Sequence, residues 1–116
     1  MIDKVSDIII LGKHYRIEYK DKPSEVDIFN RESLWGQIDY WTRSIRVFDN
    51  QNTDGDITHI LLHEIVHAIV TELHINTLKN ATDYEDVTDL LSLALSEILT
   101  NNPKLTKMFL QGENHD

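Results

Sequence analysis

Cysteine is absent from this sequence, which excludes disulfide bonds, thiolate metal sites and a cysteine nucleophile. Residues that break helices and strands are also few, with 2 prolines and 4 glycines. No stretch approaches the roughly 20 apolar residues that a membrane-spanning helix needs. The apolar run at residues 8–11 is too short for a signal sequence. These absences are compatible with a reducing cytoplasm, where we expect the protein to act without a membrane partner.

Positive charge is scarce as well, because 11 lysines and arginines stand against 20 acidic residues and the formal net charge is −9. Direct binding to nucleic acid requires a basic surface, so the composition argues against it. An acidic decoy that imitates DNA would depend on this charge alone, and acidity more often serves solubility. The length of 116 residues and the 41% hydrophobic content predict one domain, residues 1–116, with a modest core.

The spacing of apolar residues changes near residue 50. Before that point, short alternating segments predict an antiparallel β region of two hairpins, the second turning near residues 41–43. The predicted strands cover residues 8–11, 15–19, 35–40 and 44–48. Residues 26–29 fit either a short helix or a loop. The region 1–50 is therefore predicted to be mainly β.

Helical spacing follows in residues 51–110, so we predict an α+β fold. A first helix covers about 54–73, capped by Asn52, Thr53 or Asp54. A polar connection at 76–81 leads to a second helix at about 83–100, which Asn101-Asn102-Pro103 ends. The last segments are a short helix at 104–110 and a frayed tail at 111–116.

The motif H-E-x-x-H lies at residues 63–67, inside the first predicted helix. Histidines four residues apart project from one helix face, so His63 and His67 can reach one Zn²⁺ at about 2.0–2.1 Å. Glu64 then lies where it can take a proton from an activated water. The helix is apolar nearly all round, so we expect these side chains to be buried and to need polar partners. The alternative is a pair of ordinary helix histidines.

A catalytic zinc usually has three protein ligands and one open position. His74 is one residue out of register for the extended pattern H-E-x-x-H-x-x-G-x-x-H, so we do not favour it. If the second helix packs antiparallel to the first, a carboxylate at its start is better placed. Glu85 is our first choice because it lies one turn before Asp89 and near the apolar stripe; Asp89 and Asp86 stay as alternatives. All three also complement the positive end of a helix.

Together these segments resemble the small HExxH proteins of phages and mobile elements that are grouped with the ImmA/IrrE metallopeptidases. The likeness covers roughly residues 34–103. It is carried by G-Q-I-D-Y at 36–40, S-I-R-V at 44–47, L-L-H-E-I-V-H-A-I at 61–69, and the helix from Glu85 to N-N-P at 101–103. The resemblance implies a zincin-like minimal core of the gluzincin type, with His63, His67 and Glu85 as zinc ligands and Glu64 as the catalytic carboxylate.

The resulting prediction is a zinc metallopeptidase with one Zn²⁺ per chain and a peptide or protein substrate, such as a regulatory protein. An extended peptide could pair with the sheet edge, for which we expect residues 44–48. The alternative is a metal-binding interaction module on the same fold that has lost useful hydrolysis.

Further roles follow from the same prediction. Tyr84, Tyr40 and His59 are candidates to stabilise the oxyanion. Trp35 and Trp41 are expected to pack in the core or against the sheet, and the alternative is that they form platforms for a substrate.

Overall fold

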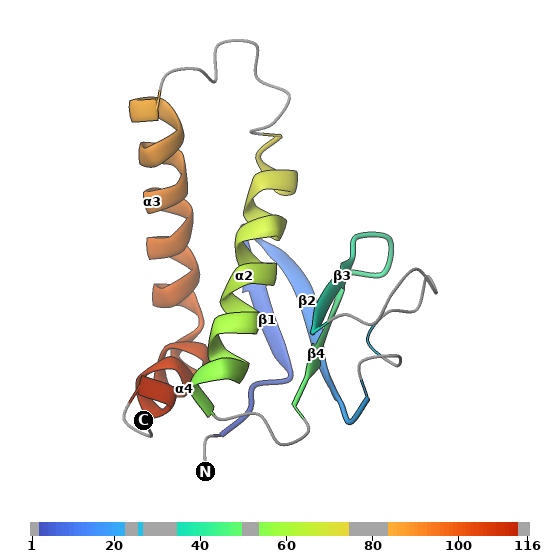
Figure 1. The fold of residues 1–116 in the computed structure, drawn as a ribbon. Coiled ribbons are helices and arrows are strands. Elements are labelled where there is room, and N and C mark those ends of the chain that lie inside the picture. The colour runs from blue at the N-terminus through green and yellow to red at the C-terminus, as the bar shows by residue number, and fades with distance from the viewer. Residues whose placement is uncertain (1–2, 23–25, 27–34, 50–53, 75–83, 114–116) are drawn as a thin grey trace.

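A computed structural model describes residues 3–22, 26, 35–49, 54–74 and 84–113. Within these ranges the protein is α+β, with a four-stranded mixed sheet followed by three helices (Figure 1). The strands are β1 (Asp7–Ile10), β2 (Lys13–Lys20), β3 (Gly36–Asp39) and β4 (Ser44–Phe48). The helices are α2 (Asp54–Glu72), α3 (Tyr84–Asn101) and α4 (Pro103–Glu113).

The predicted elements are confirmed, with small shifts at their ends. The break at 101–103 is confirmed too, because α3 ends at Asn101 and α4 begins at Pro103. The predicted tail is wrong at its start, since α4 continues to Glu113. Predictions for residues 27–29, 52–53, 76–81 and 114–116 lie outside the described residues. Within the described part of the chain, no helix is both long and apolar enough to cross a bilayer.

The strand order is β1-β2-β4-β3. The pairs β1–β2 and β3–β4 are antiparallel, as predicted, and the two hairpins join through a parallel pairing of β2 with β4. The first hairpin turns through Leu11 and Gly12, which both have positive φ, as a tight hairpin turn requires. Our expectation that residues 44–48 form an exposed edge is wrong, because β4 is paired on both sides and β3 lies at the edge.

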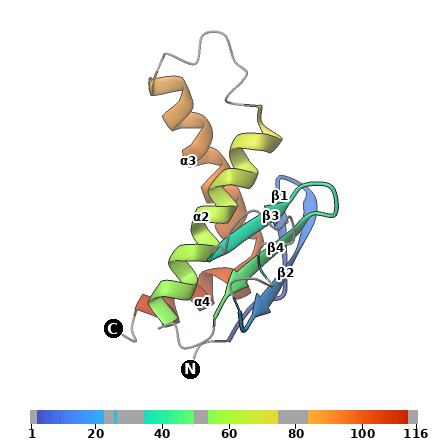
Figure 2. The ribbon, with the colours of Figure 1, turned by 45° about the vertical axis from the view of Figure 1, so that its right-hand side comes forward.

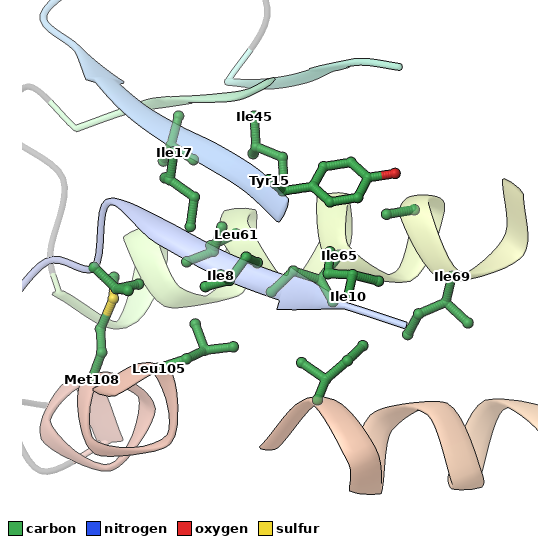
Figure 3. Close-up of a cluster of buried hydrophobic side chains, with 14 of the residues drawn as sticks. Ile8, Ile10, Tyr15, Ile17, Ile45, Leu61, Ile65, Ile69, Leu105 and Met108 are labelled. Atoms are coloured by element: carbon green, nitrogen blue, oxygen red, sulfur yellow. The ribbon is translucent and has the colours of Figure 1, made fainter. Parts of the chain in front are cut away.

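The core lies between the sheet and the helices, and α2 contacts both layers (Figures 1 and 2). Alternate strand residues face inward because successive side chains in a strand point to opposite faces. Buried side chains of the sheet, α2 and α4 form one cluster (Figure 3), which includes Ile8, Ile10, Tyr15, Ile17, Ile45, Leu61, Ile65, Ile69, Leu105 and Met108. This packing holds α2 with one face against the sheet.

The junction between α3 and α4 is fastened to β1 by Asn102. Its side-chain amide donates to the backbone carbonyl of Ile9 and accepts from the N–H of Ile9, both at 2.8 Å. The same amide donates to the carbonyl of Ile98 at 2.7 Å. One buried side chain therefore satisfies backbone groups on an edge strand and on a helix end, which would otherwise cost free energy.

Candidate metal centre

The two histidines of the motif lie side by side on α2. Their Nε2 atoms are 3.1 Å apart, and their rings meet nearly perpendicular with centroids 4.7 Å apart. Both side chains are exposed, so the prediction that they are buried is wrong. The reason is that α2 packs against the sheet and the other helices through one broad arc, which includes Leu61, Ile65 and Ala68. The opposite face is left open to solvent.

The separation of the two Nε2 atoms fits a shared zinc ion. Two nitrogens at about 2.0–2.1 Å from a tetrahedral ion are about 3.3 Å apart. The observed 3.1 Å between His63 and His67 is close to that value without any change of rotamer. Neutral imidazole nitrogens are also ligands that Zn²⁺ prefers. The pair therefore suits the metal that the motif predicts.

Glu64 lies beside the pair, but its side chain turns into the protein and is only 6% exposed. It packs against β3, where a Cβ atom on Gly36 would lie 3.0 Å from Oε2 of Glu64 and 2.8 Å from Cγ2 of Ile60. Glycine is therefore needed for β3 to approach α2 this closely. Burial raises the pKa of the Glu64 carboxyl, and the neighbouring His67 and His63 oppose the rise. A raised pKa suits a carboxylate that must accept a proton near neutral pH.

A pocket of about 220 Å³ opens between β3 and the first half of α2. It is lined by Trp35, Gly36, His59, Ile60, His63 and Glu64. The pocket thus joins one histidine of the pair and the buried carboxylate to an apolar wall. The sequence held one signal for this site, because a glycine at the start of a strand often marks a close approach of two backbones.

The expectation that both tryptophans pack in the core or against the sheet is confirmed for Trp35, which contacts Phe48 of β4, and is wrong for Trp41. Trp35 is 55% exposed and its ring meets the ring of Phe48 edge-on, with centroids 5.5 Å apart. Trp41 is 94% exposed, because it lies in the turn between β3 and β4. Of the two tryptophans, Trp35 lines the pocket and Trp41 does not.

Of the three oxyanion candidates, the structure places two near the site. Tyr40 follows β3 directly, and burial raises the pKa of its hydroxyl. A hydrogen bond with Thr71 opposes this rise, and the charge of Glu64 adds to it. Since Thr71 lies one turn after His67, Tyr40 flanks the pair on that side. His59 is exposed at the pocket rim, and the side chain of Tyr84 lies outside the described ones.

A third metal ligand is less clearly placed than His63 and His67. Among the described side chains, no third histidine, aspartate or glutamate forms a cluster with the pair. His74 and Asp89 are described; both are exposed, and neither forms such a cluster with the pair. Glu85 and Asp86 lie in the first turn of α3, and their side chains fall outside the described ones.

The position of α3 bears on this question. Leu62 and Ile65 of α2 face α3 and α4 across an apolar groove, whereas His63 and Glu64 line the pocket at β3. The pair and the packed side of α3 therefore lie on different sides of α2.

No family model, curated protein or solved structure matches this chain. The resemblance to the ImmA/IrrE metallopeptidases thus stays a prediction from the motif segments. The chemistry available to the site follows from its own groups. Two imidazoles can hold a metal, a desolvated carboxylate can take a proton, and a pocket beside them can receive part of a ligand.

Proposed function

We propose that the protein is a zinc-dependent metallopeptidase with a zincin-like core, encoded by a phage or mobile element and acting in the cytoplasm. The observation that carries the proposal is the convergence of the His63 and His67 Nε2 atoms at 3.1 Å, directly beside the buried carboxylate of Glu64. A pair of ordinary surface histidines gives no reason to bury an acid next to it, and burying a carboxylate costs free energy.

The proposed chemistry is hydrolysis of a peptide bond. When bound, Zn²⁺ would acidify a water molecule and polarise the scissile carbonyl. His63 and His67 would hold the ion at the open face of α2. Glu64 accepts the proton of the attacking water and passes it to the leaving amine. The burial that raises the pKa of Glu64 brings this carboxylate closer to the pH at which both transfers must occur.

The edge of the sheet offers a place for the substrate backbone. In the described part of the chain, β3 pairs only with β4. Phe48 N–H donates to the carbonyl of Trp35 at 2.8 Å, and bonded pairs alternate along an antiparallel ladder. The backbone groups of Gly36 and Ile38 therefore point away from β4. An extended peptide could add to this edge beside Glu64.

The decisive experiment is elemental analysis of the protein purified without added metal or chelator, followed by peptidase assays. We expect about one zinc per wild-type chain, loss of zinc in His63→Ala, and retained zinc in Glu64→Gln. The exposed His14 provides the matched control, and His14→Ala should keep its zinc. Glu64→Gln should lower hydrolysis by roughly 10²–10⁴-fold, because it removes the general base.

Two outcomes would contradict parts of this proposal. Wild-type protein that binds no zinc after reconstitution would exclude the metal centre. Zinc binding with equal rates of hydrolysis in wild type and Glu64→Gln would exclude Glu64 as the general base. Zinc binding without hydrolysis in either protein would favour the interaction module.

The third ligand is tested separately. Glu85→Gln should weaken zinc binding more than Asp89→Asn or Asp86→Asn. The reverse order would move the ligand to the more affected residue.

A further inference from the structure

The pocket beside the histidine pair has walls of two kinds. The polar side consists of His59, His63 and Glu64, and the apolar side of the Trp35 ring and Ile60. Its volume of about 220 Å³ is below the roughly 300–1,000 Å³ of sites for drug-sized molecules. A space of this size and lining is suited to a single large apolar side chain.

Trp35 is held in place for such a contact. Its backbone carbonyl accepts the N–H of Phe48, and its ring packs edge-on against the Phe48 ring. The residue is nevertheless exposed over more than half of its surface. An indole that is fixed on one side and open on the other gives a binding surface with little conformational freedom to lose.

The charge of Glu64 also disfavours acidic substrate side chains in the pocket. The carboxylate of Glu64 forms part of the wall, and the described lining residues include no lysine or arginine. An aspartate or glutamate side chain in the pocket would lose its water, would meet the like charge of Glu64, and would find no lysine or arginine in the described lining. Apolar side chains meet no such penalty.

We infer that this pocket is a specificity site, which takes one leucine, methionine or phenylalanine side chain of the substrate next to the scissile bond, and that Trp35 determines the preference. The inference rests on the proposed peptidase function. It adds the substrate class: extended peptides with a large apolar residue at one defined position. Trp35 packs against that residue, while the peptide backbone pairs with β3 at Gly36.

The first test measures kcat/KM of zinc-loaded wild type on peptides that differ only in this residue. We expect leucine or phenylalanine to exceed alanine by roughly 10–100-fold, the range that a few methylene groups supply, and aspartate to be poorer still. Trp35→Ala should reduce the ratio of leucine to alanine to less than about threefold. Trp41→Ala should leave the ratio unchanged, because Trp41 does not line the pocket.

Trp35→Phe is the control for a folding defect in Trp35→Ala, because it keeps an aromatic side chain at this position. It should give a ratio of leucine to alanine between those of wild type and Trp35→Ala. A wild type that cleaves without apolar preference, or a preference that survives in Trp35→Ala, would overturn the inference.

The second test does not depend on hydrolysis. The chain has two tryptophans, so Trp41→Phe leaves Trp35 as the only indole. In this background with Glu64→Gln, the leucine peptide should produce a saturable shift of tryptophan emission, and the alanine peptide should not. A shift without hydrolysis in wild type would support the pocket and contradict only the peptidase proposal. No shift with either peptide would overturn the pocket assignment even if the enzyme is active.

Discussion

Glu72, at the C-terminal end of α2, is a single residue that joins three parts of the molecule. Its carboxylate accepts the Tyr15 hydroxyl at 2.5 Å and pairs with Lys13 Nζ at 2.9 Å and Arg43 Nε at 3.4 Å. A negative charge is unfavourable at this end of a helix dipole, so these contacts must outweigh that cost. Burial alone would raise the pKa of Glu72. The hydrogen bonds from Tyr15, Lys13 and Arg43 lower it by more, so the net shift of the pKa is downward.

Glu72→Gln should therefore destabilise the protein in a pH-dependent way. Because the folded-state pKa lies below the unfolded value, the charged form contributes stability above pH 4.5, and this contribution is lost as the pH falls through the lowered pKa. We expect a loss of about 1 kcal/mol near neutral pH, because Lys13 and Arg43 are partly exposed and their ion pairs are screened.

Urea unfolding of wild type and Glu72→Gln at several pH values measures this difference. Glu97→Gln, an exposed position on α3, is the control and should change little at any pH. A loss in Glu72→Gln that stays constant down to the acid limit would show that the charge of Glu72 is not responsible.

At the scale of elements, the contact between β3 and α2 decides the shape of the candidate site. β3 is a four-residue edge strand, and its first residue is the glycine that faces Glu64 and Ile60. Trp35, directly before the strand, contributes to the apolar wall, and the strand itself covers the Glu64 carboxylate. Both the burial of Glu64 and the form of the pocket therefore depend on how closely these two elements approach.

Gly36→Ala should push β3 away from α2. The added Cβ would lie 2.8 Å from Ile60 Cγ2, so the Ile60 side chain or one of the two elements must shift, which typically costs about 1–3 kcal/mol of unfolding free energy. Hydrolysis should fall as well, because Glu64 moves with the contact. Thermal unfolding and kcat/KM measure the two effects.

A double-mutant cycle identifies the cause. Ile60→Ala removes the nearest atom, so Gly36→Ala should cost less stability in that background than in wild type. Strictly additive losses from the two substitutions would mean that the steric contact is not the source.

At the scale of the whole molecule, the proposed metal is attached to the element that contacts every layer. α2 packs on β1, β3 and β4 and on α3 and α4. A ligand that binds only the folded protein stabilises all of it by mass action. Zinc at His63 and His67 should therefore raise the stability of the entire chain.

Zinc at about 100 times its dissociation constant should stabilise the fold by about 2.7 kcal/mol. For a chain of 116 residues, this corresponds to a rise of roughly 10 °C in Tm. A chelator should reverse the rise, and His63→Ala should abolish it. Differential scanning calorimetry with His14→Ala as the control measures the effect, and an equal rise in His63→Ala would place the bound zinc elsewhere.

Much of the local structure could be predicted because it depends on near neighbours in the chain. Alternation of apolar residues predicted the strands, and helical spacing predicted α2, α3 and α4 to within a few residues. The convergence of His63 and His67 also followed from sequence, because a separation of four residues places two side chains on one face of any helix.

Tertiary structure alone decided which surfaces meet. The parallel pairing of β2 with β4 makes β3 the edge, and this depends on contacts between segments far apart in the chain. The exposure of His63 and the burial of Glu64 depend on which face of α2 packs against the rest of the protein. The sequence does not specify that face, because α2 has apolar residues nearly all round. The closeness of Gly36 to Glu64 likewise arises only when β3 and α2 are brought together.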